Sequence, residues 1–146
     1  MLQLLEREVS VLMRRSRRVI GERAHLVHPE LTPPGYLLMM YLQSNAQCRA
    51  ADLADALSLD KGAVSRSVHQ LVSLGLVSKE ADPADGRAVR LRVTEEAAAR
   101  MHEIGRSRLQ ALDEKLGEWS QEEIETFVAT FSRYNDLLEV SYPHHG

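Results

Sequence analysis

The sequence predicts a mainly α-helical fold with a small β-wing, in the arrangement of a winged helix-turn-helix. Three observations support this prediction. Two short helical patterns, separated by a tight polar break, occupy residues 50–73. Two strand patterns follow within residues 76–93, and the connection between them is rich in Pro, Asp and Gly. Long amphipathic helical patterns flank this segment, over residues 2–27 and from residue 94 onward.

The N-terminal part of the chain predicts two helices. Residues 2–27 place apolar side chains along one stripe at helical spacing. Thr32 is followed by Pro33 and Pro34, the pattern of an N-cap with prolines in the first turn. A second helix is therefore expected to begin there and to run to about residue 42.

A helix-turn-helix is expected next. Its first helix, over residues 50–57, turns Leu53, Ala54 and Leu57 inward, and the small Ala54 allows a close helix crossing. Asp60 stands at the N-cap position of the second helix, where its side chain can accept a hydrogen bond from a first-turn N–H.

The second helix of this motif has two chemically different faces. At about 100° per residue, one arc holds Val64, Val68 and Leu71, which predicts a buried stripe. In a helix-turn-helix the second helix enters the major groove of DNA, so the polar arc is the candidate reading face, although surface charges are often merely solvated. Its candidate DNA contacts are Lys61, Gly62, Ser65, Arg66 and His69.

The predicted hairpin adds further cations. Residues 88–93 (AVRLRV) alternate inward apolar side chains with outward Arg90 and Arg92, the period of a half-buried strand. Residues 76–81 supply a partner strand, and the connection over 82–87 leaves Arg87 at the tip. Cations on both the helix and the hairpin indicate a polyanion, so Arg87 and Arg90 are also candidate DNA contacts.

Three segments closely resemble the MarR family of bacterial winged-helix regulators: Asp60–Arg66, the Leu74–Val77 exit from the second helix, and the Asp82–Thr94 wing. The resemblance extends over nearly the whole chain. It implies a transcriptional regulator, expected to be a repressor, that binds a pseudo-palindromic operator in double-stranded DNA as a homodimer. Gly86 departs from the family, which often has two consecutive basic residues there, and leaves Arg87 as the expected minor-groove residue.

The terminal helices carry more apolar surface than the central segment needs, which indicates a partner chain. Thr94 is expected to cap the first helix after the wing, and Ser120 with Glu123 forms a capping box for the last helix. The chain is expected to be a single domain over 1–146. Within it, residues 31–93 form the DNA-binding lobe, and residues 1–30 and 94–142 form a dimerisation layer.

By resemblance, a small organic effector is expected to enter the crevice between the dimerisation helices and the DNA-binding lobe. Binding would change the spacing of the two recognition helices and release the operator. For any single candidate residue, an ordinary position in the core is the preferred interpretation. The candidates are His25, Tyr36, Met39, Met40 and Met101.

Other functional classes have weaker support. No glycine-rich phosphate loop, nucleophile elbow or His-Glu-x-x-His pair is present, and Ser65 with His69 lacks an acidic orienter, so no catalytic residue and no cofactor are expected. A regulatory metal on His25, His28 and Cys48 remains an alternative, although no HxxxH or CxxC spacing occurs. Cys48 is expected to be a bystander thiol, with redox sensing as the alternative and Arg49 as a neighbour that could lower its pKa.

Composition agrees with a DNA-binding protein once charge is divided along the chain. The net charge is −3 over 146 residues. Residues 61–92 contain six Lys/Arg and three Asp/Glu, which gives a net charge of +3. Residues 93–146 contain five Lys/Arg and eleven Asp/Glu, which gives a net charge of −6. With a single cysteine, no export signal and no apolar run of about 18 residues, a cytoplasmic location away from membranes is expected. A winged helix that binds effectors or proteins without regulating DNA remains open.

Overall fold

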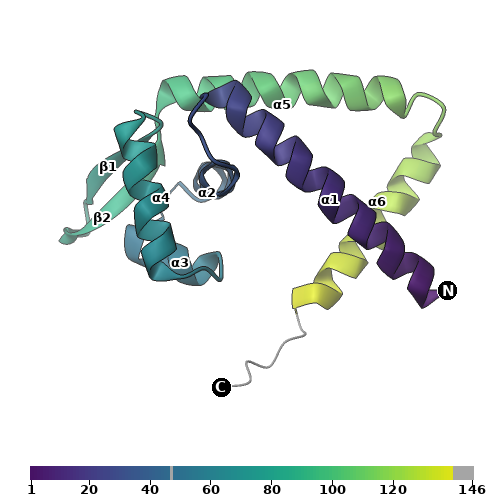
Figure 1. Cartoon of the computed structure of the whole chain (residues 1–146), viewed down its shortest axis with the longest axis horizontal. Coiled ribbons are helices and arrows are strands. Elements are labelled where there is room, and N and C mark those ends of the chain that lie inside the picture. Colours follow the sequence, from purple (N-terminus) through teal and green to yellow (C-terminus); the bar gives the residue numbers. More distant parts are fainter. Residues whose placement is uncertain (47, 140–146) are drawn as a thin grey trace. The chain divides into compact units, whose positions relative to one another are not determined.

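The computed structural model describes residues 1–46 and 48–139. In chain order the elements are α1 (Leu2–Val27), α2 (Pro33–Ser44), the 3₁₀ helix η1 (Ala50–Asp52), α3 (Leu53–Ala56), α4 (Lys61–Ser73), β1 (Val77–Asp82), β2 (Asp85–Val93), α5 (Glu95–Lys115) and α6 (Gln121–Glu139) (Figure 1). The chain divides into two compact units, Met1–Gly105 and Arg106–Gly146, and α5 contributes to both. The predicted fold class, mainly helical with a two-stranded wing, is confirmed.

The two predicted helix starts before the wing are confirmed. Thr32 Oγ1 accepts a hydrogen bond from the backbone N–H of Gly35 at 3.2 Å, at the start of α2. Asp60 Oδ2 accepts one from the N–H of Ala63 at 3.0 Å, at the start of α4. Each bond satisfies a first-turn donor that has no partner within the helix, so these caps fix where the two helices begin.

The first helix of the helix-turn-helix is shorter than predicted. A 3₁₀ turn, η1, precedes the single α-turn of α3, and such tight turns are common at helix ends. Leu53 and Ala54 are buried, as the sequence predicted. The turn into α4 places Ser58 at φ 52°, with the N–H of Leu59 donating to Ala54 O at 2.9 Å. This left-handed residue reverses the chain between the two helices.

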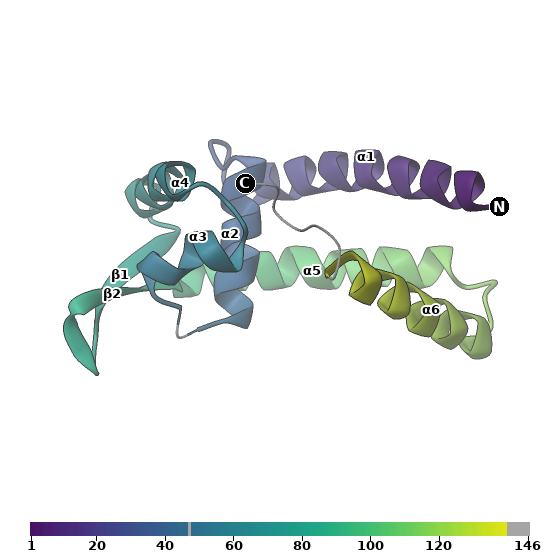
Figure 2. The same cartoon turned by 90° about the horizontal axis from the view of Figure 1, so that it is seen from below.

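The wing is a two-stranded antiparallel hairpin with a shorter connection than predicted. The register runs from Val77 opposite Val93 to Ala81 opposite Val89, and a bulge then brings Asp82 opposite Asp85. The connection contains only residues 83–84, because Asp82 Oδ1 accepts a hydrogen bond from the N–H of Ala84 at 2.9 Å and closes the turn. The hairpin tip projects beyond α3 and α4 in both views (Figures 1 and 2).

A further short segment extends the hairpin. Arg49 forms an isolated antiparallel bridge with Arg90 on β2, and the N–H of Leu91 donates to Cys48 O at 3.2 Å. The backbone that leads into η1 therefore lies along β2, on the edge opposite β1. The start of the helix-turn-helix and the wing are thus directly joined.

The core of the first unit joins α1, α2, the helix-turn-helix, the wing and the start of α5. It contains buried side chains from each of them, including Val27, Met39, Leu71, Leu91 and Met101. At the end of α4, Gly75 has φ 70° and the N–H of Leu76 donates to Leu71 O at 3.0 Å, a Schellman C-cap. A glycine is therefore favoured at this position, because it adopts a positive φ without steric cost.

Thr94 stands before α5, but its hydroxyl does not cap that helix. Thr94 Oγ1 donates instead to the carbonyl of Gly75 at 3.0 Å. The carbonyl oxygens after α4 need donors, and the end of β2 lies beside them, with the N–H of Thr94 donating to Leu76 O at 3.0 Å. The prediction of a side-chain cap at Thr94 was therefore wrong, and this residue ties the end of the wing to the exit of α4.

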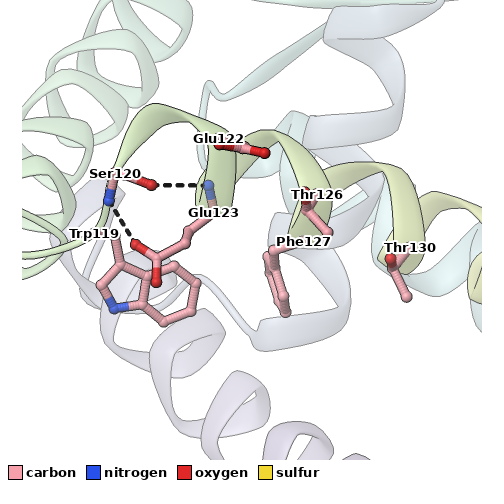
Figure 3. A pocket seen from close by; sticks show the side chains of 7 residues that line it. All are labelled: Trp119, Ser120, Glu122, Glu123, Thr126, Phe127 and Thr130. Atoms are coloured by element: carbon pink, nitrogen blue, oxygen red, sulfur yellow. Dashed lines mark hydrogen bonds between the residues drawn. The ribbon is translucent and has the colours of Figure 1, made fainter.

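The second unit contains the end of α5 and α6. The predicted capping box is confirmed, because the N–H of Ser120 donates to Glu123 Oε2 at 2.7 Å and the N–H of Glu123 donates to Ser120 Oγ at 3.2 Å (Figure 3). Residues 140–142, which were assigned to the dimerisation helices, lie outside the described residues. None of the helices in the described ranges has both the length and the apolar character needed to cross a membrane.

Candidate nucleic-acid interface

The two faces of α4 are arranged as the sequence predicted. Val64, Val68 and Leu71 are buried in the core. A Cβ at Gly62 would lie 3.3 Å from Arg66 Nη1 and 3.1 Å from Asp60 Oδ2, so the glycine leaves room for both the guanidinium and the cap. All five predicted contacts are exposed on the opposite face: Lys61, Gly62, Ser65, Arg66 and His69.

A cavity of about 470 Å³ lies between α4 and the wing. Its floor is apolar and comes from η1, α3 and the buried side of α4. Its rim is cationic and polar, with Lys61, Ser65 and His69 from α4 and Lys79 from β1. The cavity therefore has the polarity of a site for an anionic group above an apolar floor.

Lys79 is the functional candidate that the sequence reasoning missed. It lies on β1 opposite Leu91, on the sheet face that also carries the buried Val77. The signal was present in the alternation of residues 77–81, which places Lys79 in phase with a buried valine and therefore toward α4. Val89 shares this face, but it is 39% exposed at the cavity and is not the buried residue that was predicted.

Arg87 lies in the bulged part of β2, between the residues that pair with Ala81 and Asp82, next to the hairpin tip. Its backbone N–H donates to Asp85 Oδ1 at 3.1 Å, and its side chain is exposed. Within residues 1–46 and 48–139, the guanidinium of Arg87 makes no ion pair, and the same is true of Lys61, Arg66 and Lys79. These four cations present their charge to solvent.

Arg90, which was predicted to point outward as a DNA contact, lies in a half-buried position beside Asp82. Its side chain is only 23% exposed, and its Nη2 lies 2.9 Å from Asp82 Oδ1. Arg92 is exposed, but its Nη1 lies 3.7 Å from Glu80 Oε2. Both arginines therefore lie beside carboxylates of the neighbouring strand, which the alternation of residue types along one strand does not reveal.

Asp82 is a buried charge at the end of β1, beside the turn of the wing. Its side chain is fully buried and accepts hydrogen bonds from the N–H of Ala84 and, at 2.6 Å, from Arg49 Nε. The hydrogen bond from Ala84 and the guanidinium groups of Arg49 and Arg90 hold the pKa of Asp82 below its ordinary value of 3.8, against the opposing effect of burial. Asp82 is therefore a carboxylate at neutral pH.

In the part of the chain that the structure describes, Cys48 and the histidines are not grouped as a metal site. Burial, and then the negative charge of Asp52, raise the pKa of the Cys48 thiol above its ordinary value. The expectation that Arg49 lowers this pKa was wrong, because the Arg49 guanidinium is bound to Asp82. Among residues 1–46 and 48–139, no three His, Cys, Asp or Glu side chains are grouped to hold a metal ion, so His25, His28 and Cys48 are not brought together.

The predicted effector residues fall into two groups. Tyr36, Met39 and Met101 belong to the hydrophobic core of the first unit, with exposures of 4%, 0% and 5%. His25 and Met40 are exposed. The structure therefore places three of the five in packed positions that any core would need.

The terminal helices expose apolar side chains within each unit. In the second unit, Trp119 packs edge-on against Phe127 with ring centroids 6.0 Å apart, and Phe127 stacks on Phe131 at 5.7 Å. Trp119 and Phe127 line a shallow cavity of about 480 Å³ together with residues of the first turns of α6 (Figure 3). Leucines and methionines of α1 are also exposed, namely Leu2, Leu4, Leu5, Leu12 and Met13.

Comparisons with known proteins agree with this geometry. The sequence profile of the MarR family matches residues 30–88. The HTH-type transcriptional regulator YxaD of Bacillus subtilis (strain 168) is 28% identical over 133 residues, which cover 91% of this chain and 92% of that protein.

Solved structures share the fold. E. coli MarR, as a cysteine-to-serine mutant in complex with operator DNA, has a TM-score of 0.65 at 23% identity and covers 89% of this chain and 92% of its own. The regulator PcaV of Streptomyces coelicolor, in complex with its natural ligand, has a TM-score of 0.56 at 25% identity. The match covers 86% of this chain and 89% of the PcaV chain. The chain therefore has the winged helix-turn-helix fold of these structures, and its residues 30–88 are similar to the MarR family of transcriptional regulators.

Proposed function

We propose that the protein is a repressor that binds a pseudo-palindromic operator as a homodimer, with α4 in the major groove and the wing tip in the minor groove. The observation that best supports this is the sorting of α4, whose polar contacts are all exposed while its apolar stripe is buried. A helix held in this way by its own core can present base-reading side chains in a fixed geometry.

Each exposed side chain has a proposed role that follows from its chemistry. Arg66 can donate two hydrogen bonds to a guanine edge, and Ser65 can reach a base or a phosphate. Lys61, His69 and Lys79 surround the cavity between α4 and the wing, where we place a backbone phosphate. Arg87 at the tip is suited to the narrow, strongly negative minor groove. We assign no DNA contact to Arg90, because its guanidinium forms an ion pair with Asp82.

Dimerisation and effector release are the remaining parts of the proposal. The exposed apolar residues of α1 and α6 support a second copy as the partner, since such surfaces are costly in water. The solved structure of PcaV with its natural ligand supports a small organic effector. Residues 1–30 and 94–142 remain the proposed dimerisation layer, and residues 31–93 remain the proposed DNA-binding lobe.

Selection of genomic fragments by the purified protein tests the proposal. Wild type is expected to enrich an inverted repeat. The Arg66→Ala variant should bind that repeat more weakly by about 1–3 kcal/mol per contact, and each contact occurs twice in the dimer. Arg92→Ala is the matched control, because it removes an arginine that lies beside Glu80 on the hairpin. Equal binding by wild type and Arg66→Ala at physiological salt would show that this face does not read DNA.

A panel of small organic metabolites tests effector release on the same operator. A true effector should lower operator affinity at a concentration that leaves the folded dimer intact. Divalent metal ions and mild peroxide belong in the same panel, since release by either would support the metal- or redox-responsive alternative.

A further inference from the structure

We propose that Asp82 is a positioning residue for DNA binding, which joins Arg49 and Arg90 and thereby holds the wing, with Arg87, against the helix-turn-helix. The inference rests on the proposed contact of Arg87 with the minor groove. It assigns a role to three residues that do not themselves touch DNA.

The three residues come from three different segments of the DNA-binding unit. Arg49 immediately precedes η1, Asp82 ends β1 at the hairpin turn, and Arg90 lies on β2. Asp82 Oδ2 lies 2.6 Å from Arg49 Nε, and Asp82 Oδ1 lies 2.9 Å from Arg90 Nη2. One buried carboxylate therefore connects both strands of the wing to the start of the helix-turn-helix.

The physical need for such a connection follows from the wing itself. A two-stranded hairpin has little stability of its own in water, and its tip projects beyond α3 and α4 (Figure 2). In the described residues, the backbone joins the two segments at this point through the isolated bridge between Arg49 and Arg90 and the hydrogen bond from the N–H of Leu91 to Cys48 O. Charge-assisted hydrogen bonds are short and directional, so the Asp82 carboxylate can fix an orientation that the backbone alone leaves weakly determined.

Asp82 also lies close to Arg87 along the chain. The same carboxylate accepts the N–H of Ala84 and so closes the two-residue turn that leads to Asp85 and Arg87. Asp85 then accepts the N–H of Arg87 at 3.1 Å. The orientation of the tip is therefore linked through hydrogen bonds to the position of Arg49.

A double-mutant cycle tests the proposal on the operator selected by wild type, with affinity and its salt dependence as the measurements. Asp82→Asn keeps the shape of the side chain but removes the charge. We expect it to weaken operator binding about tenfold, to reduce the salt slope as Arg87→Ala does, and to reduce protection at the operator flanks only. The double variant with Arg87→Ala should bind no more weakly than Arg87→Ala alone, because Asp82 acts through Arg87.

Glu80→Gln is the matched control, since it removes one negative charge from the same hairpin while breaking only an exposed pair. It should change affinity less than about twofold. Arg49→Gln removes only the ion pair between Asp82 and Arg49, whose side chain is 40% exposed. If Asp82→Asn fails to fold, this variant should show the same loss of protection at the operator flanks. The proposal would be overturned if the losses of operator affinity caused by Asp82→Asn and Arg87→Ala multiplied in the double variant. A steeper salt dependence of operator binding by Asp82→Asn, caused by newly exposed arginines, would also overturn it. Absence of any operator binding by wild type would instead refute the proposed function.

Discussion

At the residue scale, charge on the wing is distributed by pairing across strands. The hairpin carries several arginines, yet Asp82 and Glu80 lie beside two of them and leave Arg87 and Lys79 exposed to solvent without an ion pair in the described part of the chain. Alternation along residues 88–93 correctly indicated a strand but not which cations are free. That distinction depends on register and on the segment containing Arg49, which are tertiary features.

The buried carboxylate makes stability depend on acid pH. In the folded state the pKa of Asp82 is held below 3.8, so folding favours the charged form. Its contribution is fully present above the ordinary pKa of the unfolded chain and is lost as pH falls through the lowered value. The difference in unfolding free energy between wild type and Asp82→Asn should be constant from pH 7 to about pH 5 and shrink below about pH 4. Urea unfolding at several pH values measures this, and a difference that grows with acidity would refute the assignment.

Cys48 provides a second prediction at this scale. Its thiol pKa is raised by burial and by Asp52, so little reactive thiolate is present at neutral pH. Operator complexes of wild type and Cys48→Ser should therefore respond equally to mild peroxide, with no release. Anisotropy with labelled operator gives the measurement. Release of wild type alone would show that Cys48 is an oxidation sensor.

At the element scale, local chemistry was enough to place most helices. The caps at Thr32 and Asp60 and the capping box at Ser120 each have a nearest-neighbour cause and were predicted from the sequence. The two-residue wing connection and the split between η1 and α3 were not predicted. The side chain of Asp82 closes the wing connection, and the segment that leads into η1 bridges β2 at Arg90, a residue that is distant in sequence.

The wing gives the prediction that belongs to this scale. Arg87→Ala should reduce operator affinity, flatten the salt slope by about one to two per dimer, and relax preference at the operator flanks while the central consensus persists. The reason is that minor-groove readout distinguishes little beyond A·T from G·C. Titrations at several salt concentrations and with altered flanks provide the measurement. An unchanged slope together with a lower melting temperature would show that Arg87 only stabilises the hairpin.

At the scale of the whole molecule, the exposed apolar side chains of α1 and α6 indicate assembly. We predict a dimer at micromolar concentration by sedimentation equilibrium. Phe127→Glu should shift the mass toward the monomer, because Phe127 is 54% exposed and a charge there cannot be buried cheaply. Circular dichroism must show that the variant remains helical. A folded wild-type monomer would contradict the dimer and the inverted repeat together.

The central claim is that two copies of α4 read one operator. Hydroxyl-radical and base footprinting of the selected operator tests it most directly. The account predicts two protected half-sites whose centres are about one helical turn apart, roughly 10 base pairs, with the central contacts of each half-site weakened by Arg66→Ala and the flanks by Arg87→Ala. A single protected site, or protection that neither substitution changes, would contradict it.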